Sequence, residues 1–246
     1  MATSSKSSGT DHAKSMSTAY QFKRTRDVFK PLIQEISSKG SGRSDLLEAA
    51  FFAYAHRNPL IDRIFWGRLK LVERYVLDRR FSRILDYGCG SGVMSYCLGS
   101  SGLNVTASDI DPRPLEEIRN RMAFPPSVSF IETPKLSESR FGGQFDCIVV
   151  LDVLEHIEDL TETISLFKHL LRPEGEAIVS GPTENKLYHI GRKLAGKEFT
   201  GAYHKSDVRK VRSGLSHDFL IHEIASFPPI MPLFEIFSAK NGRTKG

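Results

Sequence analysis

The sequence predicts an α/β fold in which helices cover both faces of a doubly wound, mostly parallel sheet of seven strands. From residue 82 onward, five short apolar segments alternate with segments of helical periodicity, as buried parallel strands and their crossover helices do. Two further apolar segments, at 218–225 and 233–239, flank a proline-rich connection. Such a connection is typical of an antiparallel hairpin at a sheet edge.

The N-terminal part of the chain predicts a tail followed by helices. Residues 1–43 begin with a polar stretch of low complexity and end near a glycine–serine linker, so we expect them to be disordered or poorly ordered. Residues 44–81 predict a helical cap of two amphipathic helices, because apolar side chains recur at helical spacing on either side of Asn58-Pro59. Ser44 is the expected N-cap of the first helix.

The domain that follows spans 82–240, with residues 241–246 as a second tail. Its first five strands are expected at 83–87, 104–109, 128–132, 145–151 and 176–181. Asp111-Pro112 predicts the start of a helix that runs to about residue 123, and a later helix is expected to begin near Asp159 and end at Gly175. After residue 182 the sequence becomes irregular and basic, which predicts an insertion over 183–216.

The composition limits the class of protein. Of the 246 residues, 40% are hydrophobic and 26% are charged, which suits one soluble globular domain with appendages. A net charge of +5 is small for a dedicated DNA-binding protein, so we expect no DNA partner. The three cysteines lack metal-ligand spacing and predict buried thiols and no metal site. Without a signal peptide or an apolar run of ~20 residues, the chain is expected to be cytoplasmic.

The first strand leads into the most informative segment, in which Asp86 precedes Gly88, Gly90 and Gly92. Glycines let a ligand lie directly on the backbone, because they lack a Cβ. Asp109 closes the second strand, and both carboxylates can accept hydrogen bonds from hydroxyl or ammonium groups. The pattern predicts a nucleoside ligand.

Two cofactors compete for this segment. A dinucleotide fingerprint needs a third glycine where this chain has Val93, and a carboxylate at Asp86 would repel a pyrophosphate. S-adenosyl-L-methionine carries a sulfonium and an ammonium but no phosphate, so the same carboxylate would attract it. The residues favour S-adenosylmethionine, and a nicotinamide-dependent dehydrogenase is the alternative.

Four motifs in order resemble those of the class I S-adenosylmethionine-dependent methyltransferases, at 85–92, 108–111, 145–156 and 170–175. The resemblance covers roughly 82–240 and is closest to the small-molecule branch that includes ubiquinone-biosynthesis O-methyltransferases. It implies a Rossmann-like sheet, S-adenosylmethionine as cofactor, a small-molecule acceptor, and N-terminal helices that cover the cleft.

The resemblance also implies a cofactor site at the carboxyl ends of the first four strands. There, Asp86 would order the loop and the methionine amine, Asp109 would take the ribose hydroxyls, and Ile110 would pack against adenine. The expected cofactor-binding residues are Asp86, Gly88, Cys89, Gly90, Gly92, Asp109, Ile110, Glu132, Leu151 and Asp152.

Methyl transfer from a sulfonium depends mainly on alignment of the two reactants and exclusion of water. The resemblance places Leu151 and Asp152 beside the methyl group. Two histidines are candidates for a general base: His156, just past the fourth strand, and His204, in the segment expected to cover the acceptor. An imidazole with a pKa near ~6.5 suits deprotonation of a hydroxyl. The simpler interpretation of His156 is a side chain that caps or packs the following turn, and His204 is equally interpreted as a solvated loop residue.

The acceptor is expected to be anionic or linked to a lipid or glycan, and methylated on oxygen, because residues 186–212 are rich in lysine and arginine. A solvated helix face is the simpler interpretation. A further alternative is peripheral docking at the inner face of a membrane, aided by Phe65-Trp66 between Arg63 and Arg68. A noncatalytic RNA-binding adaptor is the last alternative, and the sequence predicts no oligomeric state.

Overall fold

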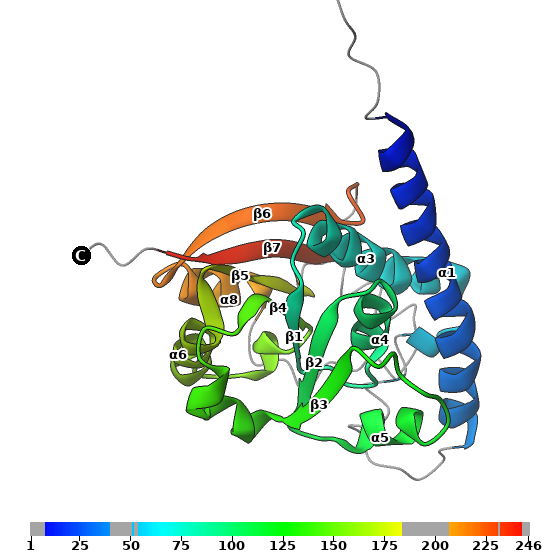
Figure 1. Cartoon of the computed structure of the whole chain (residues 1–246), viewed down its shortest axis with the longest axis horizontal. Coiled ribbons are helices and arrows are strands. Elements are labelled where there is room, and N and C mark those ends of the chain that lie inside the picture. Colours follow the sequence, from blue (N-terminus) through cyan, green and yellow to red (C-terminus); the bar gives the residue numbers. More distant parts are fainter. Residues whose placement is uncertain (1–7, 40–50, 52–53, 184–206, 231, 243–246) are drawn as a thin grey trace, which may run out of the picture.

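The computed structural model describes residues 8–39, 51, 54–183, 207–230 and 232–242. Its seven-stranded sheet has the order β3-β2-β1-β4-β5-β7-β6 (Figure 1). The four pairs among β1 to β5 are parallel, and β7 pairs antiparallel with both β5 and β6. The strands are β1 Arg83–Tyr87, β2 Asn104–Asp109, β3 Val128–Glu132, β4 Phe145–Leu151, β5 Leu171–Pro182, β6 Phe219–Phe227 and β7 Phe234–Asn241. The predicted mostly parallel sheet with an antiparallel C-terminal hairpin is confirmed.

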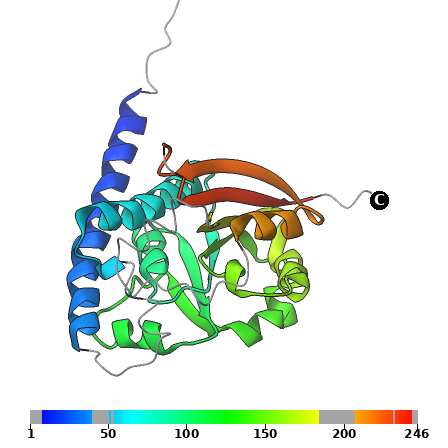
Figure 2. The same cartoon turned by 180° about the vertical axis from the view of Figure 1, so that it is seen from behind.

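Helices cover both faces of the sheet, and each face has its own hydrophobic core (Figures 1 and 2). On one face lie α1 Ser8–Lys39, α3 Pro59–Asp78, α4 Val93–Ser100 and α5 Arg113–Arg119, and on the other lie α6 Thr161–Leu170 and α8 Val208–Leu215. Short 3-10 turns occur at Thr133–Ser137, Ser139–Phe141 and Leu154–His156. The strand order reverses between β1 and β4, and in such sheets ligands bind outside the carboxyl ends of the strands at this point.

Helix α1 corrects the prediction of disorder for residues 1–43, because most of that segment is helical. Phe22, Phe29, Ile33 and Ile36 form a buried stripe at helical spacing. The ring of Phe29 packs edge-on against Tyr96 of α4, with 5.0 Å between the ring centroids. The polar first 20 residues conceal this stripe, which begins only at Phe22.

The boundaries of the other helices differ in detail from the prediction. The predicted break at Asn58-Pro59 is confirmed, and the Asn58 side chain caps α3 by accepting a hydrogen bond from the Leu60 N–H at 2.9 Å. Helix α6 ends at Leu170 rather than at Gly175, because Leu171 already pairs with Phe145 and begins β5. Helix α5 ends at Arg119, and the Ser44 start of the first cap helix lies outside the described residues.

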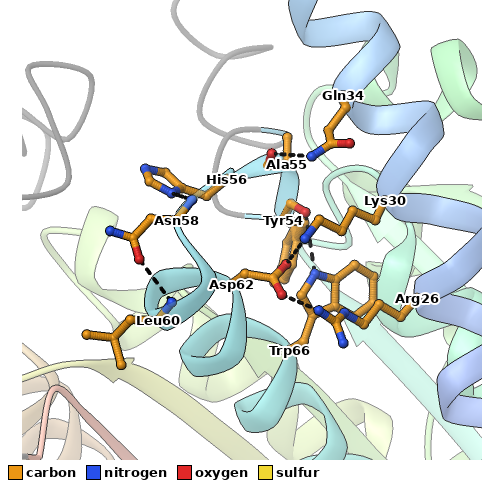
Figure 3. A network of polar contacts seen from close by, with 10 residues as sticks. All are labelled: Arg26, Lys30, Gln34, Tyr54, Ala55, His56, Asn58, Leu60, Asp62 and Trp66. Carbon is orange, nitrogen blue, oxygen red and sulfur yellow. Dashed lines mark hydrogen bonds and ion pairs between the residues drawn. The ribbon is translucent and has the colours of Figure 1, made fainter.

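A buried carboxylate of α3 forms ion pairs with basic side chains of α1 (Figure 3). Asp62, with 2% of its surface exposed, pairs with Arg26 and with Lys30, whose Nζ lies 2.7 Å from Oδ1. The indole of Trp66, one turn further along α3, donates to the Tyr54 carbonyl at 3.4 Å (Figure 3). Because the Asp62 carboxylate is buried, the position of α1 on α3 is specified by pairing as well as by apolar contact.

The predicted membrane patch around Phe65-Trp66 is wrong. Trp66 is 2% exposed and Arg68 is fully buried, so neither can reach a lipid surface. None of the helices that the structure describes combines the length and the apolar character needed to cross a membrane.

Candidate functional site

The loop between β1 and α4 folds back onto the end of β2. Gly88, Gly90 and Gly92 have φ angles of 73°, 53° and 77°, in the left-handed region that glycine adopts without strain. The N–H groups of Gly88 and Cys89 donate to the Ser108 carbonyl at 2.7 and 2.9 Å. A Cβ on Gly88 would lie 2.4 Å from the Val153 side chain, so only glycine fits between this loop and the segment after β4.

Asp86 lies beneath this loop, with 3% of its surface exposed. Its carboxylate accepts a hydrogen bond from the Ser95 hydroxyl of α4. Burial raises the pKa of Asp86 to about 6, and the negative charge of Asp109 adds to the rise, while the hydrogen bonds from Ser95 oppose it. A cation beside Asp86 would relieve this cost, which fits a ligand that carries an ammonium group.

Asp109 shapes the same loop from the other side. Its Oδ2 accepts from the Gly90 N–H at 2.7 Å, and its Oδ1 accepts from the Asp111 N–H at 3.0 Å. The next residue, Ile110, is 85% exposed, and Glu132 lies beside Asp109 in the register of β2 and β3. These predicted residues therefore lie together at the carboxyl ends of β2 and β3.

The end of β4 holds an ion pair that the sequence does not predict. Arg68 of α3 donates from both terminal nitrogens to the carboxylate of Asp152, with 2.6 Å between Nη1 and Oδ1. Asp152 adopts a left-handed φ of 57°, which is uncommon for a residue with a side chain. Leu151, the last residue of β4, is half-buried and pairs with Ser180 of β5.

Tyr54 is the second functional candidate that sequence reasoning missed. Its phenol hydrogen-bonds the Arg68 side chain, and burial raises its pKa to about 12, although the positive charge of Arg68 opposes this rise. The charges of Asp152 and Asp86 also raise the pKa of Tyr54. Tyr54 therefore stays protonated at neutral pH and is a neutral polar group within the electrostatic influence of both carboxylates.

The remaining predicted site residues do not form one cluster. His156 lies in the turn after β4, where its backbone N–H donates to Val153 and its side chain is exposed. His204 and most of the basic insertion lie outside the described residues. Burial raises the pKa of the Cys89 thiol well above its usual value, so this cysteine is a neutral part of the loop. In the described part of the chain, no group of three His, Cys, Asp or Glu side chains is arranged to hold a metal ion.

Comparison with known proteins assigns the chain to a family. The methyltransferase domain family matches residues 54–213. The ubiquinone biosynthesis O-methyltransferases of Erwinia tasmaniensis and Pseudomonas aeruginosa are 28% and 30% identical to the chain over 141 and 156 residues. These matches cover 56% and 58% of the chain but 55% and 65% of the relatives, so the chain spans less than two thirds of their length.

Solved structures show the same fold at low identity. The PH0226 protein of Pyrococcus horikoshii superposes with a TM-score of 0.61 at 18% identity, over 82% of this chain and all of that one (100%). Magnesium protoporphyrin IX methyltransferase from Synechocystis was solved with bound S-adenosylhomocysteine. It superposes with a TM-score of 0.55 at 19% identity, over 88% of this chain and 98% of that one. With the family match over more than half of its length, the chain belongs to the methyltransferase domain family, within the class I S-adenosylmethionine-dependent methyltransferases.

Proposed function

We propose that the chain transfers a methyl group from S-adenosylmethionine to an oxygen atom of a small-molecule acceptor. The observation that carries this proposal is the meeting of two carboxylates, Asp86 and Asp109, at a loop of left-handed glycines. Carboxylates suit an ammonium and a ribose diol and disfavour a pyrophosphate. Family membership decides against the nicotinamide-dependent alternative.

The described residues suggest how the cofactor would be held. Asp86 would accept from the ammonium, which relieves the cost of its buried charge, and Asp109 would accept from the ribose hydroxyls with the lone pairs that the loop leaves free. The exposed side chain of Ile110 would cover one face of adenine. Glu132, whose side chain is exposed and lies 3.4 Å from the Lys135 amine, is the proposed acceptor for the adenine amine.

S-adenosylmethionine supplies an electrophilic methyl group, and the part of the protein is to align the acceptor and exclude water. Leu151 and the backbone of Asp152 would border the methyl group at the end of β4. His156 or His204 would take the proton of the acceptor hydroxyl. Replacing each histidine by glutamine in turn distinguishes the two candidates. Only the variant that has lost the general base should lose the acidic limb of the pH–rate profile.

Oxygen is proposed as the accepting atom because the two curated relatives are named as O-methyltransferases. The proposal that the acceptor is anionic or linked to a lipid or glycan depends on the basic insertion. In the described part of it, Arg209 lies 3.6 Å from Glu235, and Arg212 lies 3.8 Å from Glu223 and Glu235. These two charges are partly compensated, so an anion would depend on Lys210 and on the basic residues within 184–206.

The cofactor is tested by calorimetry with S-adenosylmethionine and S-adenosylhomocysteine. Failure of both to bind at millimolar concentration would refute the proposal. The acceptor is tested by release of S-adenosylhomocysteine with matched phenols that carry a carboxylate, a phosphate or no charge, each with and without a prenyl tail. An anionic acceptor site predicts a lower KM for the charged phenols, whereas salt-sensitive RNA binding without turnover would favour the adaptor.

A further inference from the structure

Arg68 is the largest fully buried side chain among the described residues, and it carries a charge. Its guanidinium lies 4.2 Å from the centroid of the Phe234 ring and 5.5 Å from that of Phe65. Both of its terminal nitrogens are used by Asp152. A charge buried between aromatic rings costs several kcal/mol unless it is paired, so the pair with Asp152 accounts for the position of Arg68.

The pair lies beside the glycine loop. Val153, the neighbour of Asp152, fills the space where a Cβ on Gly88 would be. Tyr54, which hydrogen-bonds Arg68, is influenced by the charges of both Asp152 and Asp86. Asp152 directly follows β4 and Asp86 lies near the carboxyl end of β1, so these two carboxylates lie on either side of the point where the strand order reverses.

We propose that Arg68 is a positioning residue that neutralises Asp152, so that the wall of the site at the end of β4 carries no net charge beside the sulfonium. The inference rests on the proposed function. It gives a role in catalysis to an arginine of the N-terminal helices that acts through Asp152 and not on the acceptor.

The physical reason is the change of charge during the reaction. As the methyl group moves, the S–C electron pair stays on sulfur, the O–C bond forms, and the hydroxyl proton leaves to a base. The sulfonium thus becomes a neutral thioether. A free carboxylate would stabilise the cationic starting state more than the transition state, in which this charge is already dispersed, and would slow the transfer.

Tyr54 completes this neutral arrangement. An arginine side chain has only donors, so the phenol oxygen accepts from Arg68 and its proton remains with Tyr54. Because burial holds the pKa of Tyr54 at about 12, the phenol adds no charge. Arg68, Asp152 and Tyr54 together are neutral near physiological pH.

The test is the ratio of affinities for S-adenosylmethionine and S-adenosylhomocysteine, measured by calorimetry on the full chain near pH 8. It requires no knowledge of the acceptor. Arg68→Met frees the carboxylate and should raise the preference for the cationic ligand by about tenfold. Asp152→Asn leaves the positive charge of Arg68 without its counter-charge and should lower this preference by a similar factor. The double variant should return to the ratio of the unaltered protein.

A matched control is Arg79→Met. Arg79 is the C-cap residue at the far end of α3 and pairs with a buried glutamate, Glu176 of β5, at 2.9 Å. It should change stability and leave the ratio unchanged. A purely structural role of Arg68 predicts equal loss of both ligands, and shifts of the two single variants in the same direction would overturn the proposal.

If Arg68→Met fails to fold, the double variant and Asp152→Asn still decide the question. A buried pair can often be replaced by neutral groups without loss of stability, so the double variant should fold. A ratio in Asp152→Asn equal to that of the unaltered protein overturns the inference. Absence of binding of both ligands to the unaltered protein would instead overturn the proposed function.

Discussion

Asp109 and Gly90 are joined by a hydrogen bond of 2.7 Å from the glycine N–H to the carboxylate. The acid that ends β2 therefore holds the loop that follows β1, and the two motifs form one unit. A residue proposed to bind a ligand hydroxyl thus also determines the shape of the loop on which that ligand would lie.

The two roles of Asp109 can be separated. Asp109→Asn keeps an oxygen for the Gly90 N–H but removes the charge, so it should fold normally and bind S-adenosylhomocysteine about tenfold more weakly. Asp109→Ala removes both contacts and should also lower the melting temperature. Calorimetry and thermal unfolding measure the two effects, and an alanine variant that binds as tightly as the unaltered protein would exclude a role for this side chain.

Asp86 predicts a pH dependence of stability. Its pKa in the folded protein, about 6, is raised above the ordinary value of 3.8 by burial. The contribution of Asp86 to stability is therefore complete at pH values below its pKa in the unfolded chain, and it is lost as the pH rises through about 6. Asp86→Asn should stabilise the free protein near pH 8, by on the order of 3 kcal/mol at most, and change stability little near pH 4. Denaturant titrations at the two pH values measure the difference.

The opposite sign is expected at Asp146, which serves as the control. Burial acts to raise its pKa, but hydrogen bonds from Arg83 and Ser82 outweigh burial and lower it. Its contribution is present above the unfolded pKa and is lost as the pH falls. Asp146→Asn should destabilise the protein near pH 8, so a gain in stability there would contradict the assigned hydrogen bonds.

Gly88 tests the contact between the glycine loop and the segment after β4. In Gly88→Ala the new Cβ would approach Val153 to 2.4 Å in a backbone conformation that costs ~1 kcal/mol for alanine. We expect at least about tenfold weaker binding of S-adenosylhomocysteine. Adding Val153→Ala removes most of the overlap and should restore part of the affinity. No recovery in the double variant would mean that backbone strain alone causes the loss.

Asp62 tests the attachment of α1. Replacing it by alanine leaves Arg26 and Lys30 without their buried partner, and we expect a loss of about 1–3 kcal/mol. Hydrogen exchange should increase in α1 between residues 22 and 36, while the strands stay protected. Asp27→Ala, at an exposed position of the same helix, is the matched control and should leave exchange unchanged.

The strands and the glycine loop are predictable from the sequence for a local reason. Buried parallel strands are short apolar runs, and the residues that shape the loop after β1 lie within 24 positions of one another, from Asp86 to Asp109. Helix α1 is missed because its stripe begins inside a polar segment and is stabilised by contacts with Tyr96 and other distant residues.

The pair of Arg68 and Asp152 could not be predicted in the same way. Its partners are 84 positions apart, and they meet only because α3 packs across the ends of β4 and β7. On the sequence alone, Arg68 belongs to the membrane patch around Phe65-Trp66 and Asp152 to a cofactor site. The packing overturns the first assignment, because Arg68 is buried, and it gives the Asp152 carboxylate a partner that the sequence does not predict.

The position of Arg68 also bears on how this protein can be divided. A boundary at residue 82, where the strand pattern begins, would separate Asp152 from its counter-charge and expose the core that α3 covers. The smallest unit that keeps the site intact therefore begins no later than Tyr54. In a hybrid that joins this sheet to the N-terminal helices of a relative, residues 54, 68 and 152 would all need to come from the same protein.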